Sequence, residues 1–355
     1  MSLLDSRERC SGFDPNSMWS LIETFPSQIQ AAGNMVQKLD LGPCPEVRNI
    51  VVTGLGGSAI GGDVVRSAAN SLGVPLLVNR DYLLPRFVDS LTLVLACSYS
   101  GNTEETLSAY AQAKRAQAHI VCITSGGRLA QLAGSDGYPI IALPGGLPPR
   151  SALGYSTVAL LGVLGALDLL PNIDETLHET ADLLESLRHK YGIDTAEAEN
   201  QAKSMAQSFH GKIVAIYGSN GILDSAALRW RGQIEENAKN LALHHVLPEM
   251  NHNELVGWQF PAQVLKNLGV VFLRDRMDHP QVQRRFELTK EIVKVKAGVV
   301  HEVWSEGNSV LARIFSVIYL GDFVSLYLAY LNGIDPTPVP VIETLKQNLR
   351  LSASA

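Results

Sequence analysis

The chain has 355 residues, of which 46% are hydrophobic and 18% are charged. That length allows two domains, and that hydrophobic share describes a globular protein with a large core and excludes a disordered chain. The formal net charge of −6, with no basic stripe along the sequence, argues against nonspecific binding to nucleic acid.

Strands and helices alternate through the first half of the sequence. Residues 1–46 predict a helical lead-in, and from Arg48 the pattern becomes strand, turn and helix. The predicted strands cover residues 49–53, 75–79, 92–97 and 119–124. Strands that alternate with helices imply a parallel sheet with right-handed crossovers. We therefore expect a first α/β domain over residues 47–173.

A second copy of this pattern follows later in the chain. The segment 212–221 repeats a strand that ends in a Gly-Ser turn, and apolar segments at 270–273 and 299–303 repeat later strands. The expected boundaries are 174–211 for a helical linker, 212–332 for the second domain and 333–355 for a tail. The predicted fold is therefore α/β, with two tandem three-layer αβα domains, parallel sheets, and additional N- and C-terminal helices.

Two apolar segments, residues 156–170 and 310–331, raise the question whether they span a membrane or form buried helices. The first is short for a bilayer, and the second contains Arg313 and Asp322, whose charges would be costly in lipid, so we expect two buried helices. The start of the sequence has no apolar signal-peptide segment. The cysteines show no metal-ligand spacing, which favours reduced thiols in a cytoplasmic protein; they are Cys10, Cys44, Cys97 and Cys122.

A hydroxyl-rich turn follows the third predicted strand. Three hydroxyl residues surround Gly101, namely Ser98, Ser100 and Thr103, and a helix begins directly after them. The free N–H groups and the dipole at a helix N-terminus favour an anion, and the hydroxyl groups add donors. A helix cap alone would need fewer hydroxyl groups, so the turn predicts a phosphate site. The corresponding turn of the second half, at 274–278, lacks hydroxyl residues, so we expect phosphate in the first half only.

A glycine-rich turn follows the first predicted strand, at residues 54–63. Gly54, Gly56 and Ala59 fit the dinucleotide fingerprint, but that pattern alone is weak, and the Asn-Arg-Asp sequence ending the second strand is an equivocal acidic partner. A dinucleotide also gives no reason for the hydroxyl-rich turn. Neighbouring strands of a parallel sheet end at one crevice, so Ser58 and the hydroxyl-rich turn could bind one ligand, and we favour a sugar phosphate.

Acid–base candidates lie mainly in the second half. Glu235 and Glu236 are adjacent on a predicted helix, so at most one can face a site, and we interpret Glu235 as a solvated side chain. His252 lies between two asparagines in a predicted loop, and a carboxylate with an imidazole suits acid–base catalysis near neutral pH. The nearby histidines match no metal-ligand spacing such as HExxH, so we expect no metal. Arg150, in a proline-rich loop, could stabilise an oxyanion.

Together these segments resemble the bifunctional phosphoglucose/phosphomannose isomerase family, whose members are built from two sugar-isomerase (SIS) domains of flavodoxin-like fold. The resemblance covers nearly the whole chain. It is carried by GLGGSAIGGD at 54–63, SYSGNTEET at 98–106, PPRSALGYS at 148–156, IEENAK at 234–239, NHNE at 251–254 and DPTPVPVIETLK at 335–346. The hydroxyl-rich turn alone marks only a sugar-phosphate domain, whereas the later segments in this order narrow the resemblance to this family.

The resemblance implies a role for each matching residue. The residues expected to hold the substrate phosphate are Gly57, Ser58, Ser98, Ser100 and Thr103. Glu236 matches the catalytic base, and Arg150 matches the arginine that stabilises the enediolate. His252 matches the histidine that opens the sugar ring from the neighbouring subunit, and Lys346 matches the lysine that assists at the ring oxygen. Thr337 matches the threonine associated with acceptance of both C2 epimers.

The implied activity is the interconversion of glucose 6-phosphate or mannose 6-phosphate with fructose 6-phosphate through a cis-enediolate, without a cofactor. The implied assembly is a cytoplasmic homodimer with no nucleic-acid or membrane partner. Three alternatives stay open: a non-catalytic sugar-phosphate-binding regulator, an isomerase of another phosphosugar, and an NAD(P)-dependent oxidoreductase. The presence of all four acid–base and cationic residues, Arg150, Glu236, His252 and Lys346, argues against the regulator.

Overall fold

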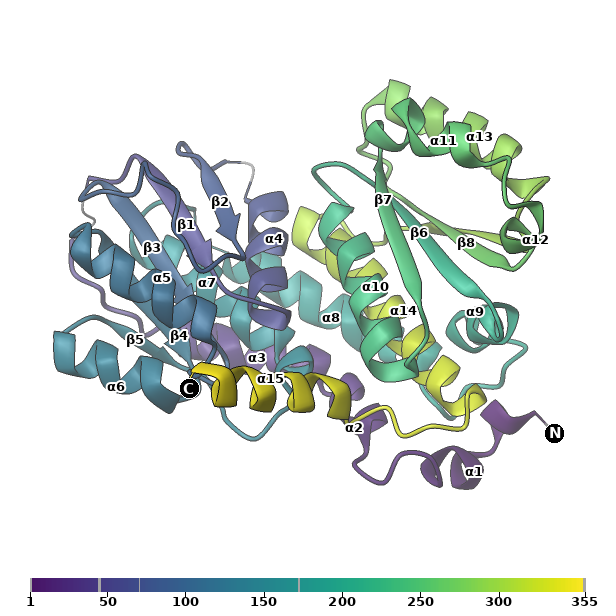
Figure 1. Ribbon diagram of the computed structural model, residues 1–355, viewed down its shortest axis with the longest axis horizontal. Helices are drawn as coiled ribbons and strands as arrows, with labels where there is room; N and C mark the ends of the chain where they lie inside the picture. Colours follow the sequence, from purple (N-terminus) through teal and green to yellow (C-terminus); the bar gives the residue numbers. More distant parts are fainter. Residues whose placement is uncertain (1, 44–45, 70, 172, 354–355) are drawn as a thin grey trace.

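A five-stranded parallel sheet forms the centre of the first half (Figure 1). The structure is a computed structural model and describes residues 2–43, 46–69, 71–171 and 173–353. The strands are β1 (Asn49–Thr53), β2 (Leu76–Asn79), β3 (Thr92–Cys97), β4 (His119–Thr124) and β5 (Ile140–Ala142), and they lie in the order β2-β1-β3-β4-β5. The central strand β3 is buried along its whole length, as expected where helices cover both faces of a sheet.

Helices cover both faces of this first sheet. The helices are α4 (Gly57–Ala68), α5 (Glu104–Arg115), α6 (Gly127–Asp136) and α7 (Leu153–Ala166), with a short 3-10 helix, η2 (Pro149–Ser151), before α7. Ile50 and Leu95 face the core that contains α4 and α7, whereas Val51 and Val94 face the core that contains α5 and α6. This alternation is the one that a strand's two-residue period produces.

A four-stranded parallel sheet forms the centre of the second half, with the order β7-β6-β8-β9. Its strands are β6 (Ile213–Ser219), β7 (Ala242–Leu247), β8 (Leu268–Arg274) and β9 (Val299–Trp304). The helical elements are α8 (Asp174–Tyr191), α9 (Gln201–Phe209), α10 (Asp224–Ala238), η3 (Glu249–His252), α11 (Glu254–Gly257), α12 (Ala262–Leu265), α13 (Pro280–Lys294), α14 (Val310–Leu331) and α15 (Pro340–Ala353). α10 and α14 cover the face turned toward the first half, and α13 covers the other face (Figure 1).

The apolar helix α14 lies inside the fold. Its length and composition would allow it to span a bilayer, but 94% of its most apolar stretch is buried inside the molecule. Its carboxylate Asp322 pairs with Arg229 of α10 at 3.0 Å, and both side chains are buried. The expectation that residues 310–331 form a buried helix is confirmed, and α7 is likewise buried along nearly all of its length.

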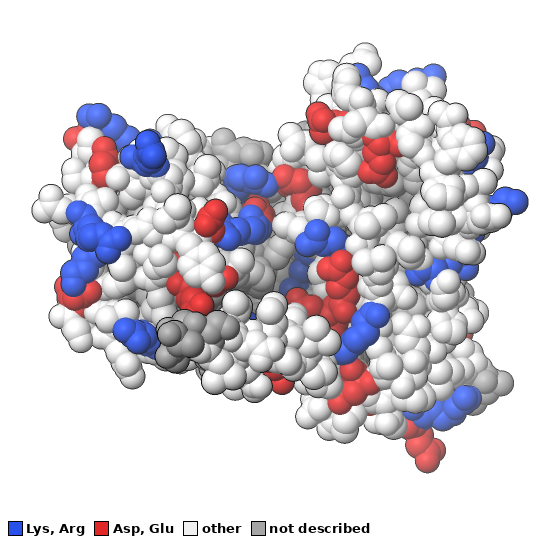
Figure 2. Space-filling view, viewed as in Figure 1, with Lys and Arg blue, Asp and Glu red and all other residues white. Residues whose placement is uncertain are grey.

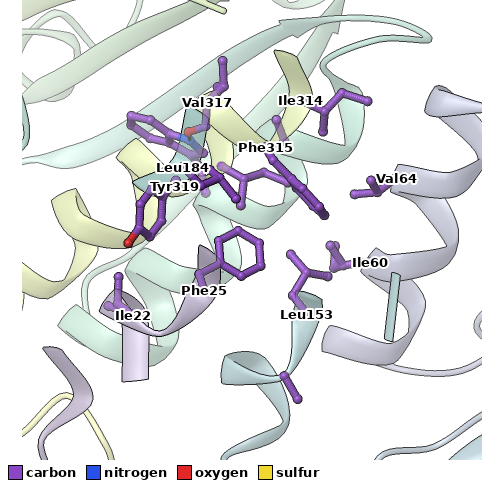
Figure 3. Packing of buried hydrophobic residues seen from close by; sticks show 14 of the residues in the cluster. Ile22, Phe25, Ile60, Val64, Leu153, Leu184, Ile314, Phe315, Val317 and Tyr319 are labelled. Carbon is purple, nitrogen blue, oxygen red and sulfur yellow. Dashed lines mark hydrogen bonds between the residues drawn. The ribbon is translucent and has the colours of Figure 1, made fainter. Parts of the chain in front are cut away.

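One hydrophobic core joins the two halves (Figure 3). Phe25 of α3 (Phe25–Val36) packs edge-on against Phe315 of α14, with 5.1 Å between the ring centroids. Ile60 of α4 and Leu153 of α7 lie beside these rings. Three short helices precede α3 in the chain, namely η1 (Leu3–Asp5), α1 (Arg7–Ser11) and α2 (Met18–Glu23). The N-terminal helix α3 therefore belongs to the core that fixes the first sheet relative to the second.

The two parallel sheets with their helical layers confirm the predicted α/β fold. The sequence patterns missed β5 and β7. β5 has only three residues, and β7 is an edge strand in which His244 and His245 interrupt the apolar pattern. Three cysteines, Cys10, Cys97 and Cys122, are free and buried as expected, whereas Cys44 lies outside the described residues.

Candidate active site

The hydroxyl-rich turn lies at the carboxyl end of β3, where α5 begins. The hydroxyl groups of Ser98 and Thr103 are 2.9 Å apart and hydrogen bond across the turn. Gly101 has a φ of 68°, and a Cβ atom there would lie 1.8 Å from the carbonyl oxygen of Gly126, so this position requires glycine. Ser100 is exposed. The turn therefore gathers hydroxyl groups at a helix N-terminus, which is the arrangement that an anion site requires.

The glycine-rich turn after β1 is hydrogen bonded to the hydroxyl-rich turn. The backbone N–H of Tyr99 donates to Ser58 Oγ at 3.2 Å. Ser58 is in the first turn of α4, so the N-termini of α4 and α5 meet at one edge of the sheet. Gly57 allows a close approach, because a Cβ atom there would lie 2.8 Å from the carbonyl oxygen of Pro149. This approach brings η2, and with it Arg150, to the same edge.

Arg150 is buried at the boundary between the two halves. Its Nε donates to Asn237 Oδ1 at 2.8 Å, and its Nη2 donates to the carbonyl oxygens of Pro336 at 2.8 Å and Thr337 at 2.7 Å. Its Nη1 lies 3.6 Å from Glu236 Oε2. Burial lowers the pKa of Arg150, and the carboxylate of Glu236 opposes that effect. One side of the guanidinium group is therefore fixed by the protein, while Nη1 faces Glu236.

Glu236 lines a cavity of about 290 Å³ between α4 and α10, together with Gly57 and Arg150. Acidic and basic side chains gather where the two halves of the molecule meet (Figure 2). The cavity thus brings a carboxylate and a guanidinium group beside the glycine-rich turn. This grouping unites the predicted base, the predicted oxyanion cation and one end of the predicted phosphate site.

The expectation that at most one of Glu235 and Glu236 can face the site is wrong, because both line this cavity. Glu235 still has 37% of its side chain exposed, in agreement with a solvated position. Burial raises the pKa of Glu235, and Arg231, at 3.6 Å, opposes that effect. The physical reason lies one turn earlier, where Gly232 also lines the cavity. Glu235 and Glu236 lie three and four residues after Gly232, so all three are on one face of α10. Because Gly232 has no side chain, space beside both glutamates stays open.

The strap, which we define as residues 335–337 after α14, closes one side of the site. Lys239 Nζ donates to the carbonyl oxygens of Asp335 at 2.8 Å and Pro336 at 2.9 Å, next to the bonds from Arg150. Burial, followed by the charge of Arg150, lowers the pKa of Lys239 to about 8. The hydroxyl group of Thr337 is buried and has no hydrogen-bond partner among the described residues. Sequence reasoning gave Lys239 no role, although its Glu-Asn-x-Lys segment was the signal available.

Lys346 lies on α15, which follows the strap. It lines a second cavity, of about 270 Å³, together with Ser100 and Thr103. The structure therefore brings a residue from the C-terminal tail to the hydroxyl-rich turn of the first half.

His252 lies away from these residues. It ends η3, which follows β7 at the carboxyl end of the second sheet, and its side chain is exposed. α10 begins near that end of the sheet and runs back along it, and a rise of 1.5 Å per residue over the 12 steps from Asp224 to Glu236 gives roughly 18 Å. Among the described residues, His252 lines neither of the two cavities, so the structure does not bring it to Glu236 within one chain.

In the second half, an ion-pair network takes the place of the hydroxyl-rich turn. The buried carboxylate of Asp275, directly after β8, accepts hydrogen bonds from Ser305 Oγ at 2.8 Å and Arg313 Nε at 2.9 Å. Arg274 forms an ion pair with Glu302. Paired acidic and basic side chains occupy the turn after β8, where the first half has hydroxyl groups. This difference favours a phosphate site in the first half alone.

Comparison with known proteins gives relatives along the whole chain. The model of the bacterial phospho-glucose isomerase C-terminal SIS domain matches residues 198–349. A bifunctional phosphoglucose/phosphomannose isomerase of Caldicellulosiruptor bescii is 45% identical over 334 residues, which cover 94% of this chain and 98% of that protein. The protein of the same name from Aquifex aeolicus is 40% identical over 86% of this chain and 92% of its own length.

Two further matches are more distant. A D-glucosamine-6-phosphate 4-epimerase of Sulfolobus acidocaldarius is 30% identical over 84% of this chain and 88% of that protein. The crystal structure of a hypothetical protein from Thermus thermophilus aligns with a TM-score of 0.73 over 98% of this chain and 94% of that one, at 17% identity, and shows the fold alone. The identity and coverage of the first two relatives show that this chain belongs to the bifunctional phosphoglucose/phosphomannose isomerase family of enzymes.

Proposed function

We propose that this enzyme interconverts glucose 6-phosphate and mannose 6-phosphate with fructose 6-phosphate. The observation that carries the proposal is the pair formed by Arg150 Nη1 and Glu236 Oε2, 3.6 Å apart, in a cavity that begins at the glycine-rich turn. A carboxylate that moves a proton between neighbouring carbons needs a cation beside the oxygen on which charge develops.

The hydroxyl-rich turn would hold the substrate phosphate. Gly57, Ser58, Ser98, Ser100 and Thr103 are the proposed ligands, and the hydrogen bond between Ser58 and the Tyr99 N–H supports their acting as one site. The phosphate does not react, so its binding energy serves to position the sugar carbons. The close packing of Gly101 against Gly126 supports a turn whose shape is set by the protein.

Glu236 would act as the base. On the open-chain aldose it removes the proton from C2, and the electron pair forms the enediolate. The same carboxyl group gives a proton to C1 while the hydroxyl proton moves from O2 to O1, which yields the ketose. Arg150 would stabilise the negative charge on the enediolate oxygen, and a fixed cation in a dry site contributes on the order of several kcal/mol. Only protons move in this step, so the proposed chemistry requires no metal or redox cofactor.

His252 and Lys346 would open the sugar ring by moving a proton between the ring oxygen and the C1 hydroxyl group. The distance of roughly 18 Å along α10 from Asp224 to Glu236 supports a homodimer in which His252 serves the site of its partner. Thr337, whose hydroxyl group is buried and unpartnered among the described residues, would contact the sugar near C2 and permit both epimers.

We further propose that residues 47–173 and 212–332 are the two SIS domains, with 1–46, 174–211 and 333–355 as lead-in, linker and tail. In this arrangement the first domain anchors the phosphate, α10 supplies Glu236, and the tail supplies Lys346 beside the hydroxyl-rich turn. A cytoplasmic location agrees with three buried, free thiols among the described residues.

The test is a coupled assay with purified protein and each of the three hexose 6-phosphates. The proposal predicts turnover of all three, and loss of at least about two orders of magnitude in kcat for Glu236→Gln with the fold intact. A regulator would bind these sugars without turnover, and an NAD(P)-dependent oxidoreductase would change nicotinamide absorbance without the coupling enzyme. Conversion of glucosamine 6-phosphate alone would favour another phosphosugar, a choice kept open by the epimerase among the relatives.

A further inference from the structure

Two polar side chains, Asn237 and Ser325, are fully buried where α10 packs against α14. The same two helices also contribute Ile234, Ala238 and Leu326 to the hydrophobic core. Buried polar groups destabilise a fold unless they are hydrogen bonded. The hydrogen-bond partners of Asn237 and Ser325 therefore indicate the role of these two side chains.

The hydrogen bonds form a chain from Arg150 to Asp322, in which each side chain donates to the next group. Ser325 Oγ donates to the carbonyl oxygen of Asp322 at 2.7 Å, which leaves its lone pairs to accept from Asn237 Nδ2 at 3.0 Å. Because Nδ2 faces Ser325, the amide oxygen of Asn237 faces the other way and accepts from Arg150 Nε at 2.8 Å. The donor-only Nε of Arg150 meets the amide oxygen, and the hydroxyl group of Ser325 anchors the other end of the same amide group.

We propose that Ser325 is a positioning residue for Arg150, acting through Asn237. With the amide held in this orientation, Nε has an acceptor and the plane of the guanidinium group is fixed, so Nη1 is held beside Glu236. Without the serine hydroxyl group, Nδ2 loses its buried acceptor, and the amide group loses the contact that holds its oxygen in place at Nε. This inference rests on the proposed function, in which Arg150 stabilises the enediolate.

A second contact from the same turn of α14 supports this assignment. The carboxylate of Asp322 pairs with Arg229, and Arg229 Nη2 donates to the backbone carbonyl oxygen of Arg150 at 2.7 Å. The backbone of Arg150 and its guanidinium group are thus both fixed relative to residues 322 and 325 of one helix. A displacement of that turn would move the whole arginine.

The experiment compares Ser325→Ala with Ser316→Ala, a matched control on the same helix. Ser316 is also buried, its Oγ also donates to the carbonyl oxygen three residues earlier, at 2.8 Å, and it also accepts one N–H, from Glu306 at 2.9 Å. Both variants should shift the urea midpoint by similar amounts. Only Ser325→Ala should lower kcat for isomerisation, by about tenfold or more, with KM changed by no more than about twofold because the phosphate turn is untouched.

A double-mutant cycle tests the route through Asn237. If Ser325 acts only through that amide, Ser325→Ala should lower kcat in the wild-type background and have no further effect in an Asn237→Ala background. An equal fold-change in kcat for Ser325→Ala and Ser316→Ala, or equal effects of Ser325→Ala in both backgrounds, would overturn the inference.

The failure of this inference is distinguishable from the failure of the proposed function. Arg150→Lys in the same assay reports whether the guanidinium group is needed at all. A large loss for Arg150→Lys with no loss for Ser325→Ala would reject only the positioning role, whereas full activity of Arg150→Lys would reject the role of Arg150 on which both rest.

Discussion

Replacing Arg150 with lysine keeps one positive charge but removes the planar guanidinium group. Arg150 donates three hydrogen bonds to protein acceptors, to Asn237, Pro336 and Thr337, and its remaining nitrogen faces Glu236. Hydrogen bonds from a charged donor typically contribute about 1.5–3 kcal/mol each, and a lysine ammonium group recovers only some of them. We therefore expect Arg150→Lys to lower the free energy of unfolding by about 2–4 kcal/mol.

The effect on catalysis should be larger than this loss of stability alone explains. An ammonium group that binds the strap carbonyl oxygens cannot also lie beside Glu236, so the developing oxyanion loses its donor and kcat should fall by about 10²- to 10³-fold. KM should change little, because the phosphate turn lies on a different element. The assay is coupled turnover of fructose 6-phosphate on protein whose folding is checked by urea titration. A kcat within about threefold of wild type, on folded protein, would refute the assignment of Arg150.

Three other predictions follow from particular contacts. Gly101→Ala places a Cβ atom 1.8 Å from the Gly126 carbonyl oxygen and should raise KM for every hexose 6-phosphate by more than about tenfold, measured by steady-state kinetics; an unchanged KM would contradict the phosphate site. The pKa of Lys239 is lowered to about 8, against about 10.4 unfolded, so the unfolded state holds more protons between these values. Wild type should therefore gain stability relative to Lys239→Met as pH rises from about 8 to 10, measured by urea titration, and a flat difference would contradict the lowered pKa. Mixing inactive Glu236→Gln and His252→Ala chains should restore up to about a quarter of wild-type turnover through heterodimers with one complete site, whereas no recovery would contradict a shared site.

The parts of the fold that the sequence predicted well are those with strong local patterns. β3 is a continuous apolar strand, and its end at Ser98 and the start of α5 are both marked by residue type, so the hydroxyl-rich turn was placed correctly between them. β7 was missed because an edge strand with one solvent-facing side tolerates His244 and His245. Local patterns identify elements that are buried on both faces and fail for those that are not.

The parts of the site that depend on distant contacts could not be predicted from local patterns. Arg150 meets Pro336 and Thr337, more than 180 positions later in the chain, and no periodicity predicts which backbone carbonyl oxygens a buried arginine will find. The expectation that only one of Glu235 and Glu236 faces the site failed for a similar reason, because the open space above Gly232 exists only once α4 packs against α10. Sequence reasoning therefore named the reacting groups and missed the residues that position them.

The central claim is that Glu236 moves a proton between C1 and C2 of a phosphate-anchored sugar. The measurement that tests it most directly is conversion of fructose 6-phosphate in D₂O, with the product examined by NMR for deuterium at C2. A carboxyl group that exchanges its proton with solvent predicts deuterium at C2 of the glucose 6-phosphate and mannose 6-phosphate formed by the wild type, and no labelled product with Glu236→Gln. Labelled product from Glu236→Gln at the wild-type rate would contradict the claim, because another group would then be the base.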